Sequence, residues 1–107
     1  PLIETKFELG DVSIDSERHE VMKAGTLIHL TPKEFDLLVT LARYSGRVVT
    51  HRQILKTVWG PSHVEDIQYL RVFIGQLRQK IETTPENPSL IQTEPGVGYR
   101  ISQNSHS

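Results

Sequence analysis

The residues best suited to molecular recognition lie in one segment of this 107-residue chain, which has no carboxylate between Asp66 and Glu82. A helix there, at about 100° per residue, has one apolar and one polar face. Glutamine and arginine hydrogen-bond base edges, apolar groups contact thymine methyls, and flanking cations reach phosphates. The segment therefore predicts a helix that reads the major groove of DNA. Its outward face carries Gln68, Tyr69, Val72, Gly75, Gln76 and Gln79, with Phe73 near one edge, Arg71 and Arg78 on one flank and Lys80 on the other.

The same face has a second interpretation, because exposed apolar groups also mark protein interfaces. Tyr69 and Phe73 would then be core or dimer-contact residues. In a winged-helix protein-interaction module, Tyr69, Val72 and Phe73 would form a hydrophobic contact. Gly75 costs a helix interior roughly 0.5–1 kcal/mol. A close approach to DNA, a close approach to another backbone, or plain tolerance would each explain it.

Hydroxyl and indole groups outside this helix can also contact phosphates. Trp59 closes the preceding helical segment; its position favours core packing, although the indole N–H can donate to a phosphate. Thr93 and Tyr99 flank a turn that contains Gly96, and each can donate its hydroxyl. Tyr99 can equally lie in the core, because it alternates with apolar neighbours.

Enzyme chemistry has no supporting constellation. The five histidines are scattered without a His-x-x-x-His pair, so no metal site is predicted. The chain has no cysteine, and Gly96-Val97-Gly98 falls far short of a phosphate-binding loop. No local nucleophile signature occurs. We therefore expect neither catalysis nor a cofactor.

These residues need a scaffold, and the first 30 residues indicate strands. Phe7 and Leu9 alternate with polar residues, and so do Val12 and Ile14, around a turn at residues 10–11. A second hairpin is predicted around Ala24-Gly25-Thr26. The expected result is an antiparallel sheet of four strands.

Three helices are predicted next. Residues 31–34 and 50–53 match capping patterns, and the helices that follow end at Ser45-Gly46 and Gly60-Pro61. Residues 62–65 are a candidate third capping box. The helix after it would bury the stripe Ile67, Leu70, Ile74, Leu77 and Ile81.

The chain closes with a predicted β-hairpin. Residues 90–93 and 97–101 read as strands, and Pro95-Gly96 suits the centre of a type II turn. The order of elements predicts an α+β fold: a winged helix-turn-helix with an N-terminal four-stranded antiparallel sheet, three helices and a C-terminal β-hairpin wing. We expect this domain to span residues 1–101 and residues 102–107 to form a disordered tail.

The formal net charge of -1 disfavours a nucleic-acid partner on average, but the charges are segregated. Residues 1–40 hold 4 basic and 8 acidic residues, whereas residues 41–82 hold 7 basic and 3 acidic ones. This asymmetry suits a polyanion partner for the middle segment, and equally a solvated helical face. No apolar run is long enough to span a membrane, and the absence of cysteine is compatible with the cytoplasm.

A resemblance to a known family adds to these inferences. Similar segments occur in the C-terminal effector domains of OmpR/PhoB-type response regulators, and the match covers roughly residues 2–101. The matching segments are 29–38 (HLTPKEFDLL), 48–55 (VVTHRQIL), 58–60 (VWG), 77–80 (LRQK) and 96–100 (GVGYR). Within the family, Gly60-Pro61 with residues 69–71 and 75–80 looks most like regulators of potassium-uptake operons.

The resemblance implies a two-component regulator of transcription and several partners. A receiver domain, phosphorylated by a sensor kinase, would precede this chain, and the start at Pro1 suggests a fragment. Family members bind promoter direct repeats in double-stranded DNA as head-to-tail dimers. They contact RNA polymerase through the loop between the second and third helices. That loop corresponds to Gly60, Pro61, Ser62, His63, Val64 and Glu65.

The resemblance also implies which residues contact DNA. Together with the residues argued above, the predicted DNA contacts are Trp59, Gln68, Tyr69, Arg71, Val72, Phe73, Gln76, Arg78, Thr93, Gly96 and Tyr99. The chain departs from the family at two places. Some members carry arginine where this chain has Pro95, and several carry arginine at the positions of Gly75 and Gln76. Both departures remove positive charge, so we expect weak binding by the isolated domain and dependence on dimerisation.

Overall fold

Alternating apolar residues build the first sheet, as the sequence predicts. The computed structural model describes residues 5–102, and its N-terminal strands are β1 (Lys6–Leu9), β2 (Val12–Asp15), β3 (Glu20–Lys23) and β4 (Thr26–Ile28). They pair antiparallel in chain order. Ala24 and Gly25 both have positive φ, 49° and 82°, which makes the tight two-residue turn between β3 and β4. One face is buried through Phe7, Leu9, Val12, Ile14 and Val21.

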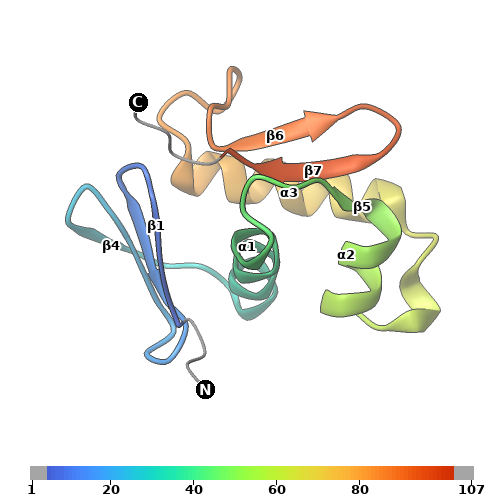
Figure 1. Cartoon of the computed structure of the whole chain (residues 1–107), viewed down its shortest axis with the longest axis horizontal. Coiled ribbons are helices and arrows are strands. Elements are labelled where there is room, and N and C mark those ends of the chain that lie inside the picture. The colour runs from blue at the N-terminus through green and yellow to red at the C-terminus, as the bar shows by residue number, and fades with distance from the viewer. Residues whose placement is uncertain (1–4, 103–107) are drawn as a thin grey trace.

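Helix α1 (Pro32–Arg43) lies at the centre of the molecule, between the first sheet and the other helices (Figure 1). Its predicted capping box is confirmed: the Thr31 N–H donates to Glu34 Oε1 at 2.9 Å, and the Glu34 N–H donates to Thr31 Oγ1 at 3.3 Å. The helix packs against α2, α3 and the wing strand β7. It therefore supports α2, α3 and the wing.

Helix α2 (His51–Val58) and helix α3 (Ile67–Ile81) form the helix-turn-helix. Thr50 caps α2 through the Gln53 N–H at 3.1 Å, and Gly60 ends the helix with φ 110°. The third capping box is wrong: the 3-10 turn η1 (Pro61–His63) occupies this region. Asp66 is the N-cap of α3, and its side chain makes no cap hydrogen bond.

The wing consists of β6 (Ile91–Glu94) and β7 (Gly98–Ile101), joined by a three-residue turn. Gly96 has φ 75°, and the Val97 N–H donates to the Glu94 carbonyl at 2.9 Å, as the predicted type II turn requires. The structure adds an element that the sequence reading missed. Strand β5 (Val49–Thr50) pairs with β7, so the wing is a three-stranded sheet in the order β5-β7-β6.

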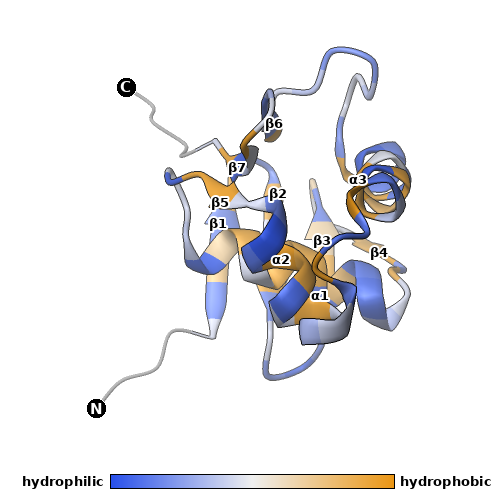
Figure 2. Cartoon of the chain, turned by 90° about the vertical axis from the view of Figure 1, so that its right-hand side faces the viewer, coloured by the Kyte–Doolittle hydropathy of each residue, from blue (hydrophilic) through white to orange (hydrophobic). Residues whose placement is uncertain are grey.

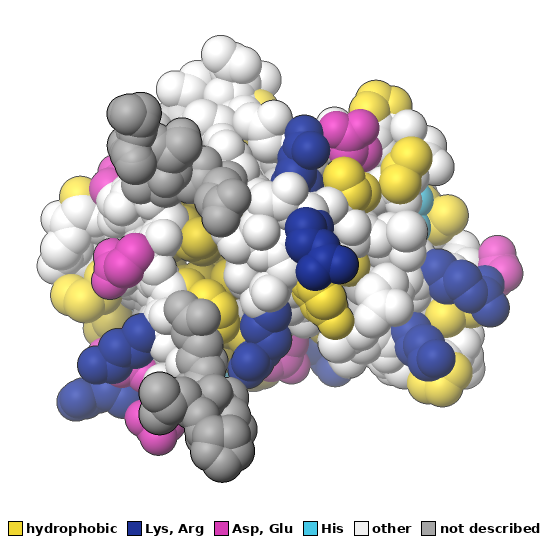
Figure 3. Space-filling model, viewed as in Figure 1, with side chains coloured by type: hydrophobic (Ala, Val, Ile, Leu, Met, Phe, Trp, Pro, Cys, Tyr) yellow, Lys and Arg dark blue, Asp and Glu magenta, His cyan; other side chains and the backbone are white. Residues whose placement is uncertain are grey.

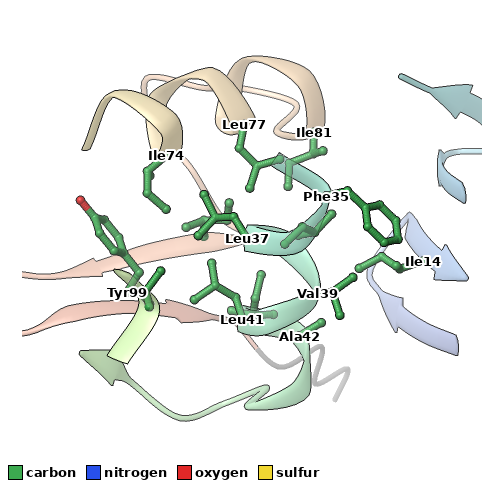
Figure 4. Packing of buried hydrophobic residues seen from close by; sticks show 14 of the residues in the cluster. Ile14, Phe35, Leu37, Val39, Leu41, Ala42, Ile74, Leu77, Ile81 and Tyr99 are labelled. Carbon is green, nitrogen blue, oxygen red and sulfur yellow. The ribbon is translucent and has the colours of Figure 1, made fainter. Parts of the chain in front are cut away.

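One hydrophobic core joins these layers (Figure 4). Leu77 and Ile81 of α3 point toward α1, and Phe35 of α1 points toward Ile14 of the first sheet. The winged-helix fold predicted from the sequence is confirmed. Ser102, the first residue of the predicted tail, is still held by its N–H to the Leu90 carbonyl at 2.8 Å. Residues 103–107 of that tail lie outside the described residues.

Candidate nucleic-acid interface

Helix α3 separates its residues as the periodicity predicts. Figure 2 shows the helix nearly along its axis, at one side of the domain. Leu70, Ile74, Leu77 and Ile81 are buried, and Ile67 is half-buried. The opposite face is exposed along Gln68, Tyr69, Val72, Gly75, Gln76 and Gln79. Tyr69 and Val72 are 49% and 51% exposed, which leaves apolar surface on the outward face of this helix.

Three aromatic rings form a cluster where α2 meets α3. The ring centroids of Trp59 and Tyr69 are 5.6 Å apart, those of Trp59 and Phe73 5.0 Å, and those of Tyr69 and Phe73 5.1 Å. All three pairs are edge-to-face, the geometry that aromatic quadrupoles favour. Phe73 and Trp59 are half-buried against the core, whereas Tyr69 remains exposed. The cluster therefore fixes Tyr69 and leaves part of its surface free.

The three cations beside this face differ in the contacts that their side chains make within the fold. Arg78 Nη2 donates to the Ile91 carbonyl at 2.8 Å and to Thr93 Oγ1 at 2.9 Å. Lys80 Nζ lies 2.7 Å from Glu34 Oε1 on α1. Arg71 is exposed, and within residues 5–102 its side chain donates only to Gln68 Oε1, at 3.3 Å. Arg71 is thus the flanking cation most available to a phosphate.

Gly75 lies in open space on the outward face. A Cβ added there would meet no heavy atom within 4 Å. A close approach to another part of the described chain therefore does not explain this glycine. Three explanations of Gly75 are left: a close approach to DNA, a close approach to the backbone of another molecule, and plain tolerance.

The predicted DNA-contact residues of the wing differ in their exposure to solvent. Thr93 is exposed beside Arg78, and Gly96 is exposed in the turn. Tyr99 is only 4% exposed and belongs to the core cluster, which favours the core alternative for its ring (Figure 4). Arg100 Nη2 is paired with Glu94 Oε2 at 3.0 Å.

His51 lies where α2, α3 and the wing converge, and sequence reasoning missed it. Its backbone N–H donates to the Val97 carbonyl at 3.0 Å, and its ring meets the Tyr99 ring edge-to-face at 5.6 Å. Burial and the nearby positive charge of Arg71 lower the pKa of His51 below its ordinary value of 6.5. In the sequence, only its place after the capping residue Thr50 pointed to it.

The loop predicted to contact RNA polymerase follows Trp59 directly. Pro61, Ser62, His63 and Glu65 are exposed, whereas Gly60 and Val64 are half-buried. His63 Nδ1 lies 2.9 Å from Asp66 Oδ2, which ties the loop to the first residues of α3. The loop is therefore ordered by local contacts and open to a partner.

Charged side chains do not merge into a continuous basic surface on the side seen in Figure 3. Lys and Arg are separated there by uncharged and acidic side chains. Within residues 5–102, no three His, Cys, Asp or Glu side chains are grouped to hold a metal ion. The helices of that same range are too short or too polar to cross a membrane.

Comparison with known proteins places this geometry in a family. The family described as "Transcriptional regulatory protein, C terminal" matches residues 25–101. The KDP operon transcriptional regulatory protein KdpE of Escherichia coli (strain K12) is 44% identical over 94 residues, covering 88% of this chain and 42% of that protein. The DNA-binding response regulator MtrA of Mycolicibacterium smegmatis is 47% identical over 94 residues, covering 88% of this chain and 41% of that protein.

A solved structure supports the same placement. The Klebsiella pneumoniae RstA DNA-binding domain, in complex with the RstA box, superimposes with a TM-score of 0.84 at 26% identity. The match covers 92% of this chain and 98% of that one. By contrast, this chain spans about two fifths of the length of its curated relatives KdpE and MtrA.

Proposed function

Because the chain belongs to the transcriptional regulatory protein C-terminal family, the DNA-binding effector domains of OmpR/PhoB-type response regulators, we propose that α3 reads the major groove of promoter DNA. The wing then meets the adjacent backbone or minor groove. Gln68, Tyr69, Val72 and Gln76 would contact base edges, while Arg71 and Thr93 would meet phosphates.

The observation that supports this placement best is the exposed face of α3. It offers amide and apolar groups over about three turns without a carboxylate, so no like charge opposes the phosphates. The aromatic cluster at Trp59 holds Tyr69 in one orientation. A fixed side chain loses little entropy on binding, which favours specific contacts.

Dimerisation on promoter direct repeats would supply affinity that one copy lacks. Arg78 and Lys80 already have partners within the chain, so few cations remain to neutralise phosphates. Two copies arranged head to tail would add their groove contacts. The isolated chain should accordingly bind one half-site weakly.

A potassium-transport operon is the proposed target. The segments that resemble potassium-uptake regulators are Gly60-Pro61 and residues 69–71 and 75–80. KdpE and MtrA have similar overall identity to the chain, so the proposal rests on these segments. It predicts tighter binding to fragments upstream of a potassium-transport operon than to shuffled fragments of equal composition.

The remaining proposed partners would bind the longer protein in which such domains occur. Residues 60–65 would contact RNA polymerase, and a receiver domain would accept a phosphoryl group from a sensor kinase in the cytoplasm. The exposed side chains of the loop suit a protein contact. In vitro transcription with alanine variants of Ser62 and His63 would test the polymerase contact separately from DNA binding.

The groove placement is tested by fluorescence anisotropy on operator and shuffled duplexes at several salt concentrations. Arg71→Ala should weaken both complexes and reduce the salt slope by about 1, whereas Gln76→Ala should lose about 1–3 kcal/mol on the operator alone. Arg18→Ala, on the loop between β2 and β3, is the control with the same charge change. Equal losses from Arg71 and Arg18 would contradict the placement.

A protein-interaction module remains the second candidate, because Tyr69 and Val72 expose about half of their surface. In that case the apolar face, with half-buried Phe73 at its edge, would dock a protein rather than a groove. A folded domain that gives no specific shift at low salt would favour this candidate. A specific shift that Val72→Ala weakens would favour DNA.

A further inference from the structure

Glu82, at the end of α3, is a buried acidic residue that the proposed DNA contacts do not use. It is 6% exposed, and its φ of -86° and ψ of 141° turn the chain out of the helix. Within residues 5–102, no lysine, arginine or histidine side chain forms an ion pair with it. A buried carboxylate is costly unless other groups satisfy its oxygens. Its partners must therefore be hydrogen-bond donors without a formal charge.

Three consecutive backbone N–H groups are those donors. Glu82 Oε1 accepts from Ser89 at 3.0 Å and from Leu90 at 3.1 Å. Glu82 Oε2 accepts from Leu90 at 3.1 Å and from Ile91 at 2.7 Å. Successive N–H groups that converge in this way form a concavity for an anion. The carboxylate thus holds the chain against the end of α3 at the point where β6 begins (Figure 1).

Ile91, the first residue of β6, is held by α3 at both of its backbone polar groups. Its N–H donates to Glu82, and its carbonyl accepts from Arg78 Nη2 at 2.8 Å. Arg78 and Glu82 are four residues apart, which places them about one helical turn from each other. The strand cannot slide along the helix without breaking one of two hydrogen bonds to charged groups. The start of β6 is therefore fixed in register relative to α3.

We propose that Glu82 is a positioning residue for DNA binding, whose carboxylate sets the register of the wing relative to α3 so that both reach one duplex together. This rests on the proposed function, which supplies the two contacts to be aligned. Thr93 lies two residues after Ile91 on β6, so a shift of the strand would displace this proposed phosphate contact. Holding the wing in place before binding also avoids an entropic cost on the DNA.

The main test is Glu82→Gln, which keeps the length of the side chain but offers one acceptor oxygen to three N–H groups. In the free chain, amide hydrogen exchange should become faster at residues 89–91 and stay unchanged in β1 and β2. Operator affinity should fall by about threefold to tenfold, the scale of one or two hydrogen bonds. Footprinting should show lost protection where the wing contacts DNA and retained protection in the major groove under α3.

The sign of the affinity change separates positioning from charge. Removing a carboxylate near DNA reduces repulsion, so charge alone predicts tighter binding by Glu82→Gln. The matched charge control is Glu86→Gln, on an exposed residue of the loop between α3 and β6, and it should not weaken binding. Glu82→Asp keeps the charge but lacks one methylene, so it should reproduce the loss of wing protection through its shorter reach.

A stability control separates positioning from a general loss of folding. Val12→Ala removes apolar volume from a fully buried site in β2, away from the wing, and should leave the wing footprint intact. Faster exchange spread evenly over the Glu82→Gln chain, or equal loss of wing protection in Val12→Ala, would overturn the proposal. So would unchanged or tighter operator binding by Glu82→Gln. A wild type that binds no operator would overturn the DNA-binding proposal itself, and the exchange at residues 89–91 would still show whether Glu82 holds the wing.

Discussion

Arg78 connects the reading helix to the wing through a single guanidinium group. Nη2 bridges the Ile91 carbonyl and the Thr93 hydroxyl, and the group lies 5.8 Å from the centre of the Tyr99 ring. Its Nε is buried and has no hydrogen-bond partner within the described residues. The main role of this side chain is therefore to position the wing, and a phosphate contact would be a secondary role.

Arg78→Ala should lower the free energy of unfolding by about 1.5–3 kcal/mol, because charged hydrogen bonds to the wing are lost. Operator affinity should fall with it, since the wing loses its support. Urea unfolding and anisotropy on the same samples measure both. Arg71→Ala, whose side chain is exposed, should stay within about 0.5 kcal/mol of wild-type stability. A stable Arg78 variant with weakened DNA binding would instead make Arg78 a direct DNA contact.

His51 should make stability depend on pH. Burial and then the charge of Arg71 lower its pKa in the folded chain, so the unfolded chain binds the proton more readily. Its contribution is fully present above the ordinary pKa near 6.5 and is lost as the pH falls through the folded pKa. Unfolding in urea at several pH values should show a steeper loss for the wild type than for His51→Gln. Parallel curves for the two proteins would refute the assignment, and His29→Gln serves as the control.

Arg78 and Lys80 show the limit of prediction from the sequence. The stripe from Leu70 to Ile81 and the exposed glutamines follow from helical periodicity, which is a local property. Arg78 is held by a hydrogen bond to the carbonyl of residue 91, and Lys80 is held by Glu34, 46 positions away. Such pairs form only when the wing and α1 pack on α3. The sequence therefore identifies the face, and the packing decides which cations remain available on it.

At the scale of elements, the wing depends on the close pairing of two antiparallel strands. Strand β5 pairs with β7 through Val49↔Tyr99 and Thr50↔Gly98. A Cβ on Gly98 would lie 2.0 Å from the Val49 carbonyl oxygen and 2.8 Å from Thr50 Cα. The two-residue strand escaped prediction because Thr50 also carries the capping signal for α2. Where one residue has two structural roles, the sequence pattern indicates only the stronger one, here the helix cap.

Gly98→Ala should therefore destabilise the chain by about 3 kcal/mol, since backbone rather than a flexible side chain must move. Thermal or urea unfolding measures the loss. The matched control is Gly75→Ala, which adds the same methyl group in open space on α3 and should stabilise the chain by about 0.5–1 kcal/mol. If both variants lost similar stability, the close approach of β5 to Gly98 would not be what excludes a side chain there. Operator binding by the Gly75 variant also separates a DNA approach from plain tolerance.

At the scale of the whole molecule, an ion pair between the buried carboxylate of Glu34 and the exposed Lys80 links the start of α1 to the reading helix. The Glu34 side chain is 3% exposed and accepts from Lys80 Nζ at 2.7 Å and from the Thr31 N–H at 2.9 Å. Burial alone raises the pKa of Glu34. The hydrogen bonds from Lys80 and Thr31, with the Lys80 charge, outweigh burial and lower that pKa below its ordinary value of 4.5.

This pair should make the free energy of unfolding sensitive to acid. A carboxyl group with a lowered folded pKa contributes stability that is complete above its unfolded pKa and is lost as the pH falls through the folded value. Near pH 7, Glu34→Gln should cost about 2 kcal/mol through its weakened hydrogen bonds. The difference between variant and wild type should shrink at pH values well below 4.5, where both side chains are neutral. The exposed Glu86→Gln should track the wild type at every pH, and a Glu34 difference that stays constant with pH would show that the charge of the pair contributes nothing.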